Sequence, residues 1–165
     1  MEEIEIEKWI SSYKRLVYGI SLTRTGNKFD ADEVFQDVFL TLYRKNPHFN
    51  DDEHRKAWLI NCTLNFCKKK TSALWKKRTV FFEEVQHKGD FRFQLPEEND
   101  LFFELSQLPE KYRTVLYLYY FERYAAEEIA ELLKIRAGTV RMQLNRGREL
   151  LKIKLGGERN ESEAD

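Results

Sequence analysis

The sequence predicts an all-α protein of two small helical domains joined by a flexible linker, with a helix-turn-helix as the C-terminal domain. Apolar residues recur at helical spacing along most of the 165 residues. Residues 79–99 break this period between two helical blocks, and a paired-helix pattern closes the second block. We expect domains at 1–75 and 100–155, a linker at 76–99 and an acidic tail at 156–165.

The first helix is predicted over residues 4–22. Its apolar residues follow the i, i+4, i+7, i+8, i+11 spacing of an amphipathic helix: Trp9, Tyr13, Leu16, Val17 and Ile20. The segment Thr25-Gly26-Asn27 is expected to end this helix.

The second helix is predicted over residues 30–45, with Asp30 or Asp32 as its cap. Asn46-Pro47 should stop it, because proline disfavours helical geometry in the preceding residue. The expected buried side chains are Val34, Val38 and Leu42, with Phe35 and Phe39 beside them.

A polar loop over residues 48–54 leads to a third helix over 55–70. Trp58, Leu59, Cys62 and Phe66 can face the first two helices. The helix ends in Lys68, Lys69 and Lys70, and further bases follow up to residue 78. This patch can bind phosphate, although the helix dipole would by itself favour bases at that end.

Residues 79–99 fit a tether better than a loose hairpin. The second block begins with Leu101, Leu105 and Leu108, and Pro109 fits a first helical position. Its apolar face continues through Tyr112, Val115, Leu116 and Tyr119, and the chain ends in a tail expected to fray.

Residues 125–155 carry the helix-turn-helix pattern. Small Ala130 permits a close helix crossing, and Ile135 and Val140 should hold it from the other side. The first helix of the pair places Ile129, Leu132 and Leu133 in the core, and the second, from about Gly138, places Val140, Leu144, Leu151 and Leu155 there. Residues 134–154 hold seven bases and one acid in a chain of net charge zero. This basic helix suits DNA, the alternative being a solvated helix packed on its neighbour.

Composition excludes several other classes of protein. No apolar run approaches the roughly 20 residues of a membrane span, and the acidic start lacks a signal-peptide pattern, so we expect a cytoplasmic protein without membrane insertion. Cys62 and Cys67 point in different directions on one helix and should stay reduced. We expect no metal site, no cofactor and no catalytic residues.

Two quoted segments resemble bacterial sigma factors of the extracytoplasmic-function (ECF) type. LPEKYRTVLYLYYFERYAAEEIAELLKIRAGTVRMQLNRGRELLK resembles their C-terminal DNA-binding domain. DADEVFQDVFLTLYRK and AWLINCTLNFCKKK are similar to their N-terminal domain, in the expected order. The resemblance implies a dissociable promoter-specificity subunit of RNA polymerase without catalysis of its own.

The resemblance also implies roles for particular residues. Docking on the coiled coil of the beta-prime subunit, with the beta subunit as a further contact, would use Asp32, Gln36, Asp37 and Phe39. The loop over residues 46–54 and the helix after it would hold the melted strand of the downstream (−10) element, through Arg55, Trp58, Asn61, Asn65, Lys68, Lys69 and Lys70. Trp58 also fits a core position.

The upstream (−35) element would be read from the second helix of the motif. The matching positions are Arg136, Thr139, Arg141, Met142, Gln143, Asn145, Arg146 and Arg148, with Arg136 and Arg148 suited to phosphate. An anti-sigma factor is a further possible partner.

The sequence departs from the family pattern at several positions. Ala125-Ala126 replace a capping Ser or Thr, Lys134 replaces a turn glycine, and Arg136 replaces a Ser. A missing cap and a left-handed non-glycine each cost about 1 kcal/mol, so we expect a softer C-terminal domain. Gln143 stands where the family commonly has Arg, and Gly147 where it commonly has Ala. These two departures put in doubt which promoter sequence is recognised.

Three rival functions stay open. A stand-alone helix-turn-helix regulator would bind DNA without polymerase and leave the acidic helix unused. A nucleic-acid enzyme would need a metal-binding or nucleophile cluster that the pattern lacks. A polymerase-binding adaptor that never melts DNA would not need the basic-aromatic third helix.

Overall fold

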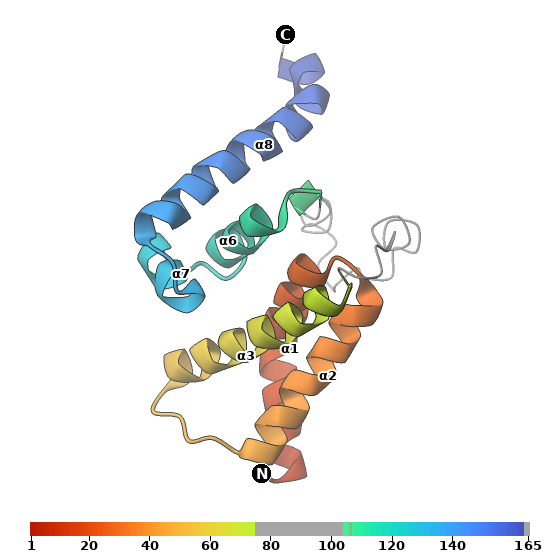
Figure 1. Ribbon diagram of the computed structural model, residues 1–165, viewed down its shortest axis with the longest axis vertical. Coiled ribbons are helices and arrows are strands. Elements are labelled where there is room, and N and C mark those ends of the chain that lie inside the picture. Colours follow the sequence, from red (N-terminus) through yellow and green to blue (C-terminus); the bar gives the residue numbers. More distant parts are fainter. Residues whose placement is uncertain (75–103, 106, 164–165) are drawn as a thin grey trace. The chain divides into compact units, whose positions relative to one another are not determined.

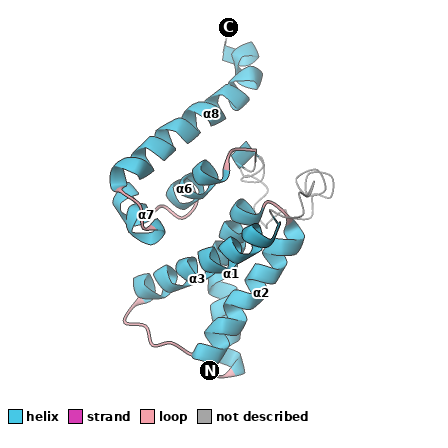
Figure 2. Cartoon of the chain, in the orientation of Figure 1, coloured by secondary structure: helices cyan, strands magenta, loops and turns pink. Residues whose placement is uncertain are grey.

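The computed structural model describes residues 1–74, 104–105 and 107–163 (Figure 1). The chain divides into two compact units, Met1–Phe93 and Gln94–Asp165. The regular structure of the described residues is helical and includes no strand (Figure 2). The predicted all-α fold with two helical domains is therefore confirmed. The expected linker over 76–99 lies entirely outside the described residues.

The N-terminal unit is a bundle of three helices, each in contact with the other two: α1 (Glu3–Thr25), α2 (Lys28–Lys45) and α3 (Asp52–Leu74). Its core follows the predicted apolar faces of α1 and α2 in the main. Of the four α3 residues predicted to face the other helices, only Leu59 is buried, whereas Trp58, Cys62 and Phe66 are half-buried. The fully buried side chains include Val17, Ile20, Val34, Val38, Leu42, Leu59 and Ile60.

The turn between α1 and α2 corrects the predicted cap. Gly26 takes the left-handed conformation (φ 74°) and ends α1. The side chain of Asn27 then caps α2 by accepting a 2.8 Å hydrogen bond from the backbone amide of Asp30. Asp30 is held by the Asn27 amide at 2.7 Å instead of capping, so the prediction of Asp30 or Asp32 was wrong and the helix begins two residues earlier.

The loop between α2 and α3 covers residues 46–51. Asn46, in the left-handed region (φ 41°), closes α2 where Asn46-Pro47 predicted its end. Asp51 accepts a 2.8 Å hydrogen bond from the backbone amide of His54. This contact starts α3 at Asp52, three residues before the predicted start, because acidic side chains suit a helix N-terminus.

The C-terminal unit contains α6 (Glu110–Tyr120), α7 (Ala126–Leu133) and α8 (Ala137–Glu163), with α8 in contact with both other helices. Pro109 stands at the cap position and not at the predicted first helical position. Residues 113–118 of α6 are all buried, more than the single predicted face. The predicted core is confirmed at Ile129, Val140, Leu144 and Leu151, while the side chain of Leu155 lies outside the described part.

The turn of the helix-turn-helix has the strained geometry that the sequence indicated. Lys134 adopts φ 58°, in the left-handed region that favours glycine. Ala125 occupies the N-cap of α7 and has no side-chain oxygen, so half of a capping box remains: Glu128 accepts a 3.0 Å hydrogen bond from the Ala125 amide. Helix α8 continues to Glu163, through most of the segment predicted as a frayed tail.

Candidate nucleic-acid interface

The outward side of α8 gathers the residues predicted to read the upstream element. Met142, Asn145 and Arg146 share one face at i, i+3, i+4 spacing and are exposed, Met142 to 60%. Arg136 and Arg141 are also exposed, beside and on the first turns. Thr139 and Gln143 lie half-buried along one edge of this face. An exposed Met beside polar and cationic groups can meet a base edge and its neighbouring phosphates.

Two of these arginines have partners inside the unit. Arg141 forms an ion pair with Glu127 of α7. A hydrogen bond from the Glu127 backbone, followed by the Arg141 guanidinium, lowers the pKa of Glu127. Arg146 lies 3.9 Å from Glu149 and stays largely exposed. Both ion pairs are exposed to solvent and therefore contribute little to stability. They orient the two arginines, and DNA could replace the acids as their partner at small energetic cost.

Arg148 has a structural role that the sequence did not predict. Its Nε donates a 2.7 Å hydrogen bond to the hydroxyl of Tyr120 on α6, and its Nη1 donates one of 3.0 Å to Asn145. Its guanidinium carbon lies 5.3 Å from the ring centroid of Tyr119. Arg148 therefore ties α8 to α6, where we predicted a phosphate contact.

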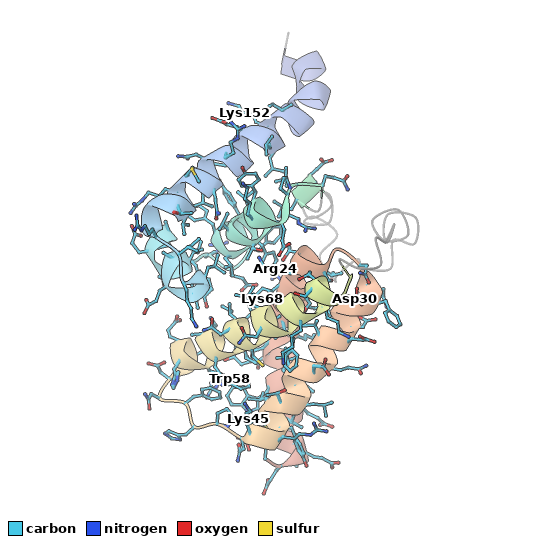
Figure 3. All side chains as sticks on the ribbon, viewed as in Figure 1. Arg24, Asp30, Lys45, Trp58, Lys68 and Lys152 are labelled. Carbon is cyan, nitrogen blue, oxygen red and sulfur yellow. The ribbon has the colours of Figure 1, made fainter. Side chains whose placement is uncertain are left out.

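The outward side of α3 forms a second polar and basic surface. Trp58, Asn61, Asn65, Lys68 and Lys69 recur at i, i+3, i+7, i+10, i+11 and so lie on one face of the helix. Figure 3 labels Trp58 and Lys68 along α3. Trp58 is half-buried, and its ring meets Phe49 edge-on at 5.9 Å, so it is neither a core residue nor fully free. Aromatic, amide and ammonium groups in one row suit a single nucleic-acid strand.

Lys70 does not belong to this exposed row. It forms an ion pair with Glu33 of α2, and the hydrogen bond that its ammonium donates to the Glu33 carboxylate raises the pKa of Lys70. In this structure Lys70 therefore joins α3 to α2 at the position where we predicted a phosphate contact.

Arg55 also has a different environment from the one predicted. Its guanidinium carbon lies 3.8 Å from the ring centroid of Trp9 on α1 and 5.7 Å from that of Phe49 in the loop. Nη1 of Arg55 lies 3.6 Å from Oδ1 of Asp52, and that carboxylate accepts a hydrogen bond from the hydroxyl of Tyr13. This hydrogen bond is the main cause that lowers the pKa of Asp52.

The outward side of α2 is a mixed apolar and polar face. Phe29, Gln36, Leu40 and Tyr43 recur at i, i+7, i+11, i+14, and Phe29 and Leu40 are 71% and 47% exposed. Asp32 and Asp37 flank this face and are half-buried. Lys28 donates to Asp32 at 3.0 Å, and Tyr18 also donates to it; burial and Asp32 together raise the pKa of Tyr18.

Phe39, predicted as the aromatic anchor of this face, is only 5% exposed. Its ring packs on Phe35 with centroids 4.9 Å apart. It is a core residue in this structure, and Leu40, the next residue, occupies the outward position. Phe39 was correctly predicted to lie beside the buried residues of α2. A buried side chain cannot also contact a docking partner, so the two expectations for Phe39 conflict.

The remaining functional expectations concern thiols and metals. Cys67 is buried, Cys62 is half-buried, and both are in the reduced form, as predicted. Burial raises the pKa of Cys62 to about 11, which makes this thiol a poor nucleophile. Within the described ranges, no group of three His, Cys, Asp or Glu side chains is arranged to hold a metal ion. Among the described helices, none combines the length and apolar content of a membrane span.

Comparison with family models gives two matches. A model described as sigma-70 region 2 matches residues 9–77, and one described as sigma-70, region 4 matches residues 101–151. The first covers the three-helix bundle and the second the helix-turn-helix unit. Together they span the larger part of the chain.

Curated proteins resemble the chain over most of its length. The ECF RNA polymerase sigma factor SigW of Bacillus subtilis is 28% identical over 164 residues, which covers 88% of this chain and 86% of SigW. The ECF RNA polymerase sigma-E factor of Haemophilus influenzae is 28% identical over 163 residues, covering 88% and 85%.

Two solved structures share the fold. CnrH, in complex with the cytosolic domain of CnrY, is 18% identical with a TM-score of 0.64, over 94% of this chain and 90% of CnrH. The sigma factor RpoE of Bartonella quintana, in complex with the anti-sigma factor NepR, is 17% identical with a TM-score of 0.65, over 92% and 97%.

Proposed function

The chain belongs to the sigma-70 family, as a sigma factor of the ECF type, and we propose that it binds core RNA polymerase and directs it to promoters with two recognition elements. One observation carries this proposal: regions 2 and 4 occur in one chain, in that order, and each coincides with a folded unit. A stand-alone regulator would need only the helix-turn-helix.

We assign polymerase docking to the outward face of α2. Exposed Leu40, Phe29 and Tyr43 supply apolar area, while Gln36 and the flanking carboxylates of Asp32 and Asp37 suit a basic helical partner. A basic coiled coil, such as that of the beta-prime subunit, has the complementary chemistry. Phe39 supports this face from the core and does not contact the partner.

We assign the two promoter elements to the two basic surfaces. Outward residues of α8, with Arg141, Met142 and Arg146 at the centre, would enter the major groove of the upstream element. The outward row of α3 from Trp58 to Lys69, with the loop over residues 46–51, would hold the single strand of the downstream element. In this role the protein selects and opens DNA, and the polymerase supplies the catalysis.

An anti-sigma factor is a further proposed partner. RpoE, which shares this fold, was solved in complex with the anti-sigma factor NepR. Such a protein would compete with polymerase for the exposed face of α2, because both need that apolar area.

The test is to mix the purified full chain with bacterial core polymerase and follow co-elution on a sizing column. We expect co-elution, and displacement by a housekeeping sigma factor, after which the holoenzyme selects a two-part promoter from random duplex DNA. Absence of co-elution, together with tight binding of duplex DNA by the chain alone, would instead identify a stand-alone regulator.

A further inference from the structure

The segment between α2 and α3 is fixed to α1 through aromatic rings and one arginine. Phe49, the only large apolar side chain of residues 46–51, lies 5.6 Å from Trp9 and 5.9 Å from Trp58, measured between ring centroids. His54 meets the same Phe49 ring edge-on at 5.4 Å. Three parts of the chain, α1, the loop and α3, therefore meet at one ring.

Arg55 lies within this group of rings. Its guanidinium covers the Trp9 ring at 3.8 Å and approaches Phe49 at 5.7 Å, and its side chain is only 30% exposed. Asp52, held by Tyr13 and 3.6 Å from Arg55, supplies the opposite charge. The rings and the carboxylate stabilise this half-buried cation in its observed position. If the guanidinium moved to bind a DNA phosphate, these contacts would be lost.

We propose that Trp9 and Arg55 are positioning residues for the downstream promoter element: their stack holds Phe49, and with it the loop over residues 46–51, in the shape that receives the melted strand. Arg55 acts through the loop and does not touch DNA. This inference rests on the proposed function, since it concerns the surface assigned there to the single strand.

The geometry of the loop explains why its position matters. Asn46 closes α2 in a left-handed conformation, Asp51 caps α3, and Phe49 points inward between these two fixed ends. Both neighbours of Phe49, His48 and Asn50, are exposed. Fixing Phe49 therefore fixes the outward direction of the two polar side chains beside it, which pre-organises them for a ligand.

The test compares holoenzymes that contain wild-type chain, Trp9→Leu, Arg55→Gln and the double variant. The ligand is the single strand of the downstream element from the promoter that wild-type holoenzyme selects. Ile4→Ala is the matched control, because Ile4 lies on α1 and is exposed. We expect about tenfold weaker strand binding for each single variant and little more for the double, because both break one stack. Polymerase binding and duplex binding of the upstream element should stay unchanged.

The salt dependence of strand binding separates positioning from direct contact. The slope of log affinity against log salt is negative, and loss of one phosphate contact on a single strand reduces its magnitude by about 0.7. We expect the slope of Arg55→Gln to equal that of wild type. A slope whose magnitude is smaller by about 0.7, or losses of binding free energy that add up in the double variant, would show that Arg55 binds DNA directly. Either result would overturn the inference.

Hydrogen exchange in the free protein distinguishes a local change in the loop from unfolding of the N-terminal unit. In Trp9→Leu we expect faster exchange of the amides of residues 48–54 and unchanged protection of the centre of α2. Trp9→Phe keeps a ring under Arg55 and should restore most of the strand affinity. If Trp9→Leu exposes the loop amides and still binds the strand like wild type, the inference is wrong even though the proposed function holds. Failure of wild-type chain to bind polymerase would instead defeat the proposed function.

Discussion

The Nε atom of Arg148 donates a hydrogen bond of 2.7 Å to the hydroxyl of Tyr120, and this bond joins the basic helix α8 to α6. Arg146, two residues earlier, points to the opposite part of the helix surface, where its contact is Glu149 at 3.9 Å. Two arginines of one predicted DNA-binding set therefore have separate structural tasks.

We expect Arg148→Ala to destabilise the C-terminal unit by about 1 kcal/mol, because two hydrogen bonds and the contact with Tyr119 are lost. Arg146→Ala should change stability by less than about 0.5 kcal/mol and still weaken upstream-element binding by the holoenzyme. Hydrogen exchange of the α8 amides measures stability for this unit alone, and duplex titration measures affinity. Equal stability losses in the two variants would contradict this division of tasks.

Substitution of Lys134 by glycine is expected to increase the stability of the C-terminal unit, in contrast to Arg148→Ala. The φ of 58° at Lys134 is unfavourable for a side chain with a Cβ atom, so Lys134→Gly should stabilise the C-terminal unit by about 0.5–1 kcal/mol after the greater flexibility of glycine in the unfolded chain is subtracted. The control is Glu131→Gly, inside α7, which should destabilise by about 1 kcal/mol. Two glycines three residues apart should thus shift amide protection in opposite directions.

The missing cap of α7 gives a third prediction. Ala125 already has the extended backbone of an N-cap (φ −71°, ψ 158°), and Glu128 already bonds its amide. Ala125→Ser completes the capping box and should stabilise the unit by about 0.5–1 kcal/mol. Ala126→Ser, one residue into the helix, lacks this geometry and should give no gain; a gain of the same size there would exclude capping as the cause.

The docking face is tested by two adjacent residues of α2. Leu40 is 47% exposed, so Leu40→Arg should leave the fold intact and weaken polymerase binding at least about tenfold by placing a charge opposite a basic partner. Phe39 is 5% exposed, so Phe39→Leu should cost about 1 kcal/mol or more of stability and leave polymerase affinity nearly unchanged. Co-elution and thermal unfolding measure the two effects, and the reverse pattern would return the docking role to Phe39.

Periodicity predicted which helices exist and, for most of them, which side is buried, since burial follows the 3.6-residue repeat. On α3 it favoured Trp58, Cys62 and Phe66, which are half-buried, over Ile60 and Cys67, which are buried. It could not distinguish Phe39 from Leu40, because adjacent apolar residues near the edge of a buried face satisfy the same pattern. It also placed Asn27 only in the segment that ends the first helix and not as the cap of the second, because two nearby aspartates were the cap candidates.

The contacts that join separate helices were beyond the sequence. Nothing in the local pattern of Trp9 indicates that Arg55 stacks on it across 46 residues of chain, or that Glu33 takes Lys70 out of the basic patch. Both pairings depend on the angles at which helices cross, which side-chain packing decides. The consequences of having Ala125 and Lys134 in place of the residues usual in the family could be predicted from the sequence, because a helix cap and a left-handed turn are local features.

Gly147 lies where α8 packs closely on α6. A Cβ atom at this position would lie 2.7 Å from Cδ1 of Leu116, 3.2 Å from its Cγ and 3.3 Å from Cβ of Tyr112. Leu116 is fully buried, so moving its side chain away would disturb its packed neighbours. The crossing of α6 and α8 therefore depends on the absence of a side chain at Gly147.

Gly147→Ala brings two opposing effects. Alanine favours a helix interior over glycine by about 1 kcal/mol, whereas forcing a methyl group into a packed core costs about 1–3 kcal/mol. Because the contact at 2.7 Å is with a fully buried side chain whose displacement would disturb its packed neighbours, we expect net destabilisation of about 1 kcal/mol. Gly138→Ala is the matched control on the same helix: nothing lies within 4 Å of its Cβ position, so the helix preference acts alone and should stabilise. In a Leu116→Ala background the penalty at residue 147 should disappear, and amide protection of α8 in the four combinations gives the coupling; independent effects would show that α6 can move aside.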